Sequence, residues 1–266
     1  MKISCCSWAL QGSEQDILTQ IASTGLTHID YRPFDFRSDK SKQKMIDLGL
    51  IPTCIATGFG MPDNVALDSP DPSARLVAFE HTRASLEYAD QSNARIAYML
   101  PGKGDHADAL KFYGDGTLKL ADIAKQYGIK LCIEHFPGTT LPTIQSTLNF
   151  ITTLNHTDLF LLLDIGHAQI SGEDPAIAVT MAGNRLGYFH LDDNDGKSDL
   201  HWGLLDGILT EDVLRTTLQA LTNIGYKEPL SIEISPKLYD PLATISQSFQ
   251  LMNAIYQSDT EPSSAR

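Results

Sequence analysis

Four short apolar runs in the second half of the sequence each end in a residue that can bind a divalent cation. The runs are LCIE, LLLD, GYFH and LSIE, and their last residues are Glu134, Asp164, His190 and Glu233. Three carboxylates brought together would repel one another and raise their pKa values unless a cation lay among them. Oxygen ligands with one imidazole favour Mn²⁺, Mg²⁺ or Co²⁺ over structural zinc, which prefers sulfur and more nitrogen. The pattern predicts one bound divalent ion, with Mn²⁺ as the first choice.

Each of these residues also has an ordinary structural explanation when it is taken alone. A carboxylate at the end of a strand is often a helix cap or one half of a loop ion pair. A single histidine such as His190 is often a core residue with satisfied hydrogen bonds. Repetition at equivalent positions of four successive runs is what favours a metal site over these alternatives.

Other candidates lie close to the same four residues in the sequence. His167, in DIGH, comes three residues after Asp164 and is expected to face the same site. The segment HLDDNDGKSDLHWG carries Asp199 and His201 as D-x-H, either as substrate ligands or as part of a solvated acidic loop. Trp8, just past the first apolar run, is expected to stack on an apolar ligand face or to be a plain rim tryptophan. Weaker candidates are His135, Lys103 and Lys237.

The elements that must position these residues follow one repeating unit: a helical pattern, a glycine, then a short apolar run. The runs cover 2–6, 27–31, 51–56, 95–100, 129–134, 159–164, 186–190 and 230–234. Gly25, Gly49, Gly128 and Gly225 precede runs and fit the left-handed position that ends a helix. Strands that alternate with helices imply a parallel sheet, and eight such units predict a (β/α)8 TIM barrel. A doubly wound open sheet is the rival fold, but no GxGxxG follows the first strand.

Length and composition limit the protein class further. A single barrel domain is expected over 1–256, and the Ser-, Glu- and Pro-containing tail 257–266 is expected to be disordered. The net charge of −13 opposes binding to nucleic acid phosphates. The start of the chain lacks the apolar length of a signal peptide, and no stretch reaches membrane-spanning length. The four cysteines have no metal-site spacing. We therefore expect a cytoplasmic protein with reduced thiols, no nucleic acid or membrane partner, and a homodimer as the default assembly.

The chain resembles the xylose isomerase-like TIM barrel superfamily, the sugar phosphate isomerase/epimerase proteins, over nearly its whole length. The passages LADIAKQYGIKLCIEHFPG, LLLDIGHAQISGEDP, FHLDDNDGKSDLHWG and SIEI carry the resemblance. Its most specific element is the ordered set Glu134, Asp164, His167, His190, Asp199, His201 and Glu233. That set is similar to the metal and substrate shell of the family.

The resemblance implies an activity and roles for these residues. It implies a divalent-metal-dependent sugar isomerase or epimerase that acts on a ketose or related keto-sugar through a metal-stabilised enediolate. Glu134 and Glu233 would both bind the metal and move protons, one abstracting a proton and the other returning it. His167 would hydrogen-bond a substrate oxygen, and Asp199, His201 and Trp8 would complete the substrate site.

Two departures from the better-known ketose 3-epimerases leave the substrate and outcome open. Those enzymes carry a second glutamate six residues after the first, where this chain has Thr140, and an arginine in NDR, where it has Asn194-Asp195-Gly196. A metal-dependent lyase or dehydratase of a keto-sugar or inosose is therefore the alternative on the same site. An endonuclease IV-like apurinic-site nuclease needs further mouth histidines that HIDYRP, CIATGFG and YMLPGKG do not supply. A catalytically inactive sensor barrel is disfavoured by the intact four-residue set.

Overall fold

The computed structural model describes residues 2–260, and its centre is a closed barrel of eight parallel strands in sequence order. The strands are β1 (Ile3–Cys6), β2 (His28–Tyr31), β3 (Ile51–Ala56), β4 (Ile96–Met99), β5 (Lys130–Glu134), β6 (Leu159–Asp164), β7 (Leu186–Leu191) and β8 (Leu230–Ile232). Each strand pairs with the next, and β8 closes the ring by pairing Leu230 with Ile3 of β1. The predicted barrel is confirmed, with a strand within each of the eight apolar runs apart from a one-residue extension of β7.

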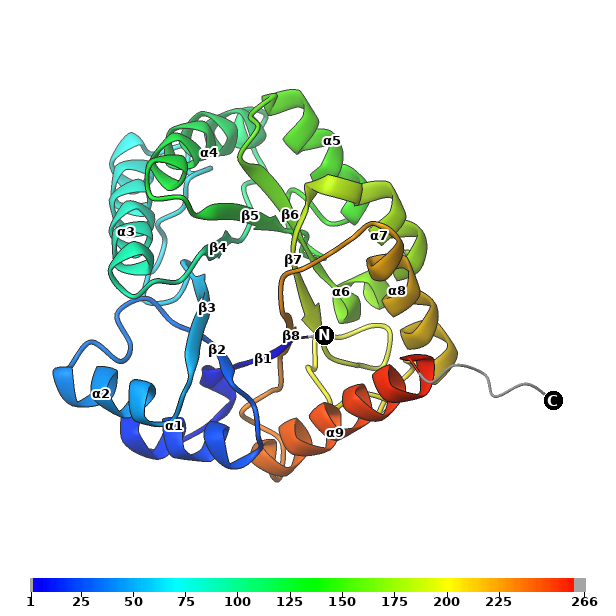
Figure 1. The fold of residues 1–266 in the computed structure, drawn as a ribbon. Helices are drawn as coiled ribbons and strands as arrows, with labels where there is room; N and C mark the ends of the chain where they lie inside the picture. The colour runs from blue at the N-terminus through cyan, green and yellow to red at the C-terminus, as the bar shows by residue number, and fades with distance from the viewer. Residues whose placement is uncertain (1, 261–266) are drawn as a thin grey trace.

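Helices surround the strands and form the outer layer (Figure 1). They are α1 (Glu14–Ser23), α2 (Asp39–Asp47), α3 (Pro72–Gln91), α4 (Ala109–Gln126), α5 (Ile144–Leu154), α6 (Ile165–Ser171), α7 (Pro175–Ala182), α8 (Glu211–Asn223) and α9 (Pro241–Thr260), with short 3-10 turns η1 (Ser7–Ala9) and η2 (Gly183–Arg185). Helix α9 continues beyond residue 256 to Thr260, and residues 261–266 of the expected tail lie outside the described residues. Within residues 2–260, no helix combines the length and apolar character needed to cross a membrane.

Local sequence explains where the helices begin and end. Ser13 and Asp16 form a reciprocal capping box at the start of α1, and Asp71 caps α3 ahead of a proline in its first turn. The four glycines predicted at helix ends, Gly25, Gly49, Gly128 and Gly225, all have positive φ, between 66° and 89°. Glycine adopts this conformation without the steric cost that a side chain would bring.

The core has two parts because alternate residues of a barrel strand face opposite ways. Outward-facing residues pack against the helices in one large apolar cluster. Inward-facing residues form a second cluster that includes Cys6, Cys54, Tyr98, Cys132 and Tyr188. All four cysteines of the chain are buried and free, as predicted.

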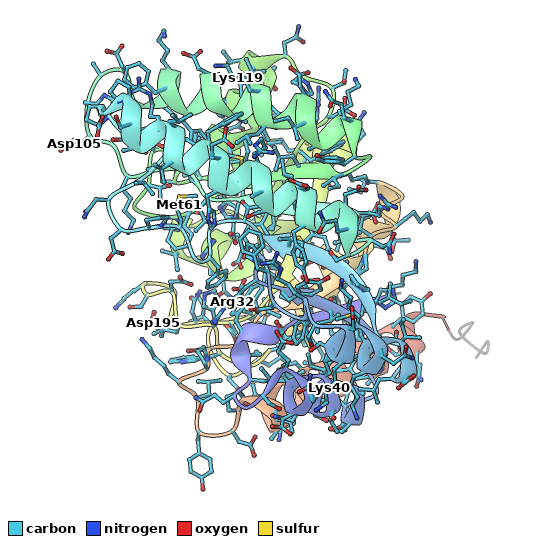
Figure 2. All side chains as sticks on the ribbon, turned by 90° about the vertical axis from the view of Figure 1, so that its left-hand side faces the viewer. Arg32, Lys40, Met61, Asp105, Lys119 and Asp195 are labelled. Atoms are coloured by element: carbon cyan, nitrogen blue, oxygen red, sulfur yellow. The ribbon has the colours of Figure 1, made fainter. Side chains whose placement is uncertain are left out.

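The loops that follow the strands gather at one end of the barrel. Figure 2 shows Arg32, Met61, Asp105 and Asp195 towards the same side of the molecule, and these residues lie in the loops after β2, β3, β4 and β7. Active sites of such barrels form at this end, because the loops after the strands can vary without disturbing the core.

Candidate metal centre and active site

The four residues predicted to bind a metal meet at the mouth of the barrel. Glu134 and Asp164 end β5 and β6, His190 is the penultimate residue of β7, and Glu233 directly follows β8. All four side chains are buried, and one ligand atom from each lies within 4.8 Å of the others. The cluster therefore has the composition and compactness of a site for one divalent ion.

The carboxylate oxygens of this cluster converge on Nδ1 of His190. Nδ1 of His190 lies 2.6 Å from Oε2 of Glu233, 3.6 Å from Oε1 of Glu134 and 3.7 Å from Oδ2 of Asp164. Neither Nδ1 of His190 nor Oδ2 of Asp164 makes a hydrogen bond to any described residue. Buried polar atoms normally have partners. Unpartnered donors that converge in this way fit an oxygen-rich cation site.

Asp164 caps a helix with one carboxylate oxygen and turns the other towards the cluster. Its Oδ1 accepts a 2.7 Å hydrogen bond from the backbone N–H of His167 and so caps α6. Its Oδ2 is left facing the cluster. The strand ends in aspartate because a single carboxylate can begin the next helix and offer a metal ligand at once.

Burial and the neighbouring charges shift the pKa values of the cluster residues. Burial raises the pKa of Glu134, and the nearby His190 and His167 only partly offset this effect. Burial also acts to raise the pKa of Glu233, but His190 and His201 outweigh it and lower that pKa to about 2. Burial alone would lower the pKa of His190, yet Glu233 and Glu134 raise it well above its usual value. A divalent cation placed among the three carboxylates would offset their negative charge.

Trp8 positions one of the glutamates. Its indole Nε1–H donates a 3.0 Å hydrogen bond to Oε1 of Glu233, which leaves Oε2 for the cluster. Trp8 lies in η1 and is only 8% exposed, with its ring 5.1 Å from that of Phe59. A substrate contact of Trp8 remains a prediction, since the structure shows its contact with Glu233.

Trp8→Phe should lower turnover, or the affinity for the metal, by about ten- to a hundredfold, the usual cost of losing a partner that orients a metal ligand. Phenylalanine keeps an aromatic ring beside Phe59 but cannot donate to Glu233. Steady-state kinetics and a chelator competition measure the effect. Trp202→Phe is the matched control, because the hydrogen bonds of Trp202 come from its backbone. Equal behaviour of the two variants would contradict the role given to Trp8.

A second group of side chains borders the metal cluster. Nε2 of His167 lies 3.4 Å from Oδ1 of Asp199, and Nε2 of His201 lies 3.0 Å from the same oxygen. Nδ1 of His167 bonds the backbone oxygen of His135 at 3.0 Å. Burial alone would lower the pKa of His167, but Asp164 and Asp199 raise it to about 10. Burial would raise the pKa of Asp199, but His167 and His201 hold it well below its usual range. The predicted residues His167, Asp199 and His201 therefore lie together beside the cluster.

One residue that borders the cluster, Asp192, was not predicted from the sequence. Its Oδ2 pairs with Nδ1 of His201 at 2.9 Å, and its Oδ1 accepts a hydrogen bond from the N–H of Gly166. Burial and the charge of Asp164 raise its pKa to about 7. A Cβ on Gly166 would lie 2.5 Å from this carboxylate, which explains the glycine in DIGH. The acidic run HLDDND was the available signal, but it did not indicate which aspartate turns inward.

A comparison with known protein families identifies the group to which the chain belongs. Residues 18–255 match the family described as the xylose isomerase-like TIM barrel. The chain belongs to this family. The resemblance that the motifs indicated is thereby confirmed.

Two relatives with named activities match part of this chain. D-psicose 3-epimerase of Agrobacterium fabrum is 28% identical over 176 residues, which cover 59% of this chain and 58% of that protein. Inosose dehydratase of Clostridium beijerinckii is 31% identical over 83 residues, 31% of this chain and 28% of that protein. These matches thus span less than two thirds of either relative. The structure of an L-ribulose 3-epimerase superposes with a TM-score of 0.82 at 21% identity, covering 100% of this chain and 99% of the other, and shows the shared fold.

Thr140 and the segment 194–196 are the positions at which this chain departs from the ketose 3-epimerases. Thr140 and Asn194 make hydrogen bonds to other loops or helices at the mouth. The hydroxyl and backbone N–H of Thr140 both bond the backbone oxygen of Gly102, so Thr140 joins the loops after β5 and β4. The side chain of Asn194 donates to the backbone oxygen of Gly166, and Gly196 has a φ of 75°. These contacts tie loops of the mouth together.

The weaker sequence candidates have different surroundings. His135 is fully buried, with its Nε2 near the backbone N and O of Asp164, so it packs under the metal cluster. Lys103 and Lys237 are exposed on the loops after β4 and β8.

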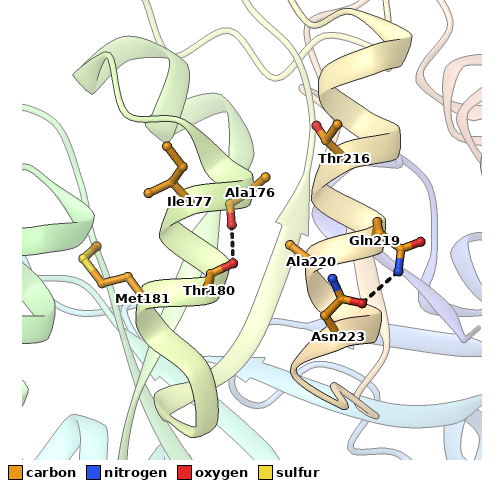
Figure 3. Close-up of a pocket in the computed structure, with 8 residues that line it drawn as sticks. All are labelled: Ala176, Ile177, Thr180, Met181, Thr216, Gln219, Ala220 and Asn223. Carbon is orange, nitrogen blue, oxygen red and sulfur yellow. Dashed lines mark hydrogen bonds between the residues drawn. The ribbon is translucent and has the colours of Figure 1, made fainter.

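A hollow of about 510 Å³ lies elsewhere, between α7 and α8 on the outside of the barrel (Figure 3). Its lining is Ala176, Ile177, Thr180, Met181, Thr216, Gln219, Ala220 and Asn223. None of these side chains titrates or offers a strong metal ligand. The candidate metal-binding residues lie instead at the mouth of the barrel.

Proposed function

We propose that this protein is a divalent-metal-dependent sugar isomerase or epimerase that acts on a ketose or a related keto-sugar. The observation that carries the proposal is the buried cluster in which Glu134 and Glu233 approach the same point as Asp164 and His190. The two glutamates come from β5 and β8, with β6 and β7 between them, so they flank the point where a substrate would bind. Mn²⁺ is the proposed ion, with Mg²⁺ or Co²⁺ as alternatives.

The residues of the chain supply the proton transfers. A bound divalent cation would act as a Lewis acid that makes the C–H beside a carbonyl more acidic. One glutamate takes that proton, and the other returns it to the opposite face or to the neighbouring carbon. Trp8 holds Glu233 in place for this step. His167 bonds a substrate oxygen through Nε2, which makes no hydrogen bond to any described residue.

A metal-dependent lyase or dehydratase is the second candidate, and the match to an inosose dehydratase supports it. It would use the same proton abstraction but lose a substituent from the next carbon instead of regaining a proton. The threonine at 140 and the glycine at 196 favour a substrate other than a free ketohexose. In either case the partner is a small sugar-like molecule; a homodimer and a cytoplasmic location remain predictions.

Solvent isotope exchange tests the proposal. The Mn²⁺-loaded protein is incubated in D₂O with ketoses, 3-keto glycosides and inososes, and the products are read by NMR. We expect deuterium at the carbon beside the carbonyl, or loss of a β-substituent in the lyase case, with neither in a chelator-treated sample. Turnover with retained C–H and no elimination would indicate a hydride shift and contradict the proton-transfer roles. Cleavage of DNA at abasic sites would overturn the sugar-enzyme proposal.

A further inference from the structure

The side chain of Tyr98 reaches across the inside of the barrel to the metal cluster. Tyr98 lies on the inner face of β4, in the apolar cluster inside the barrel, and is only 5% exposed. Its ring meets the ring of His190 edge-on, with the centroids 5.3 Å apart and the planes at 89°. Because β5 and β6 separate β4 from β7 in the ring of strands, this contact spans the interior. The ring of Tyr98 therefore borders one of the four cluster residues directly.

The hydroxyl of Tyr98 makes no hydrogen bond to any residue between 2 and 260. Buried tyrosine hydroxyls usually have a partner. The hydroxyls of other buried or half-buried tyrosines of this chain donate to an oxygen of the protein, as in Tyr88, Tyr113, Tyr188 and Tyr226. The oxygen of Tyr98 is also not sealed in by its neighbours, unlike the unpartnered Nε2 of His190. It is thus a donor that borders open space beside the cluster.

The two proposed proton carriers do not use this hydroxyl. Burial raises the pKa of Tyr98 well above its usual value, and the charges of Glu233 and Glu134 act in the same direction. The hydroxyl therefore keeps its proton and can donate. Both oxygens of Glu233 already have other neighbours, since Oε1 accepts from Trp8 and Oε2 lies 2.6 Å from Nδ1 of His190. Tyr98 is thus not needed to hold that glutamate, and its hydroxyl remains available to a ligand.

On the basis of the proposed function, we propose that Tyr98 is a further catalytic residue, whose hydroxyl donates a hydrogen bond to the substrate oxygen on which negative charge develops. When a glutamate takes the proton, the electrons of the C–H bond form a carbon–carbon double bond, and the π electrons of the carbonyl move onto its oxygen. A donor already fixed beside that oxygen stabilises the charge without reorganisation. The proton of Tyr98 stays on Tyr98 throughout.

This role is the same for an isomerase and for a lyase. In an isomerase or epimerase, the charge leaves the oxygen when a carbon regains a proton from a glutamate. In a lyase, the charge leaves it when the carbonyl forms again and the substituent on the next carbon departs with the electron pair of its bond. Both reactions pass through the same charged oxygen, so the contribution of Tyr98 does not depend on which of them occurs.

Tyr98→Phe tests this inference, because it removes the hydroxyl and keeps the ring against His190. Its kcat and KM are measured with the sugar that the D₂O screen identifies, together with its metal content and Tm. The Mn²⁺-loaded protein is also titrated calorimetrically with glycolohydroxamate, a small planar anion that carries its charge on oxygen. Tyr226→Phe is the matched control. The hydroxyl of Tyr226 donates to the backbone oxygen of Pro229, just before β8, at the opposite end of the barrel.

We expect Tyr98→Phe to lower kcat by about 10²- to 10³-fold, the usual cost of removing one donor to a developing oxyanion, with little change in KM. Glycolohydroxamate should bind about ten- to a hundredfold more weakly, the range for a hydrogen bond to a charged group. Metal content and Tm should not fall, because the substitution removes no hydrogen bond within the protein. Tyr226→Phe should keep both the kcat and the hydroxamate affinity of the natural protein.

Where turnover is measurable, both effects are required, and either one without the other overturns the inference. Loss of bound metal in Tyr98→Phe also overturns it, since the hydroxyl would then act through the cluster and not on the substrate. If Tyr98→Phe behaves like the natural protein and both exchange deuterium, the inference fails and the proposed function stands. If the natural protein exchanges deuterium with none of the sugars, the proposed function fails, and the hydroxamate titration alone decides whether Tyr98 binds an oxyanion.

Discussion

Replacing Glu134 or Glu233 with glutamine is expected to lower turnover by about two to four orders of magnitude, the usual contribution of a positioned acid or base. Glutamine keeps the shape and one ligand oxygen of the side chain, but it cannot carry a proton. Because each glutamate is assigned one of the two transfers, each single variant should lose most activity. Deuterium incorporation should distinguish the two variants. The variant that lacks the base for a given direction of the reaction should show no exchange when the reaction is started in that direction.

A matched control exists at the opposite ends of the same two strands. Glu228, just before β8, pairs with Lys130 at the start of β5 at 2.7 Å. Glu228→Gln breaks this half-exposed pair, whose contribution to stability is small, and should leave turnover unchanged. If Glu134→Gln and Glu233→Gln retained the activity of Glu228→Gln, the acid–base assignment would be wrong even though the fold is right.

Asp164→Asn is expected to weaken metal binding by more than about a hundredfold, beyond the ten- to hundredfold typical of residues that only orient ligands. The amide oxygen can still accept from the N–H of His167 and cap α6, since asparagine is a good N-cap. The substitution removes the charge and the oxygen that faces His190. Purified without chelator, the natural protein should contain about one ion per chain and the variant far less.

Thermal unfolding distinguishes a lost ligand from a damaged fold. An ion that binds only the folded protein raises its stability, so added Mn²⁺ should raise the Tm of the natural protein but not that of Asp164→Asn. Asp174→Asn is the control, because Asp174 caps α7 by accepting from Ala176 and Ile177 and lies outside the cluster. Unchanged metal content in Asp164→Asn, measured by elemental analysis, would remove Asp164 from the ligand set.

Much of the fold could be predicted because its signals are local. The apolar runs mark strands buried on both faces, and the glycine before a run marks the end of a helix through its positive φ, as at Gly128. The end of the last helix was harder to predict from the sequence. Helix α9 continues to Thr260 through Gln257 and Ser258, polar residues that had been assigned to the tail. Composition alone does not show that a polar segment continues a helix.

The candidate site could be predicted only where it repeats the strand pattern. Glu134 and Asp164 stand at strand ends, so barrel geometry alone brings them together. The hydrogen bond from Trp8 to Glu233 joins residues 225 positions apart and depends on which way an indole turns in the mouth. Asp192 depends on a loop in which His201 adopts a φ of 47°. Such choices arise from packing between loops, which no single segment encodes.

The positions of the four cluster residues in the sequence have an evolutionary consequence. All four residues of the metal cluster are encoded after residue 129, whereas Trp8, Arg32, Phe59 and Tyr98 are encoded before it. A single recombination event between the codons for β4 and β5 would give a hybrid gene that keeps the four cluster residues and acquires different loops after β1 to β4. Strand register at the new junction is set by backbone pairing between Ile96 and Lys130, which does not require particular side chains. The four cluster residues can thus be inherited together while the first half changes, provided that the new first half again supplies a donor such as Trp8 to hold Glu233.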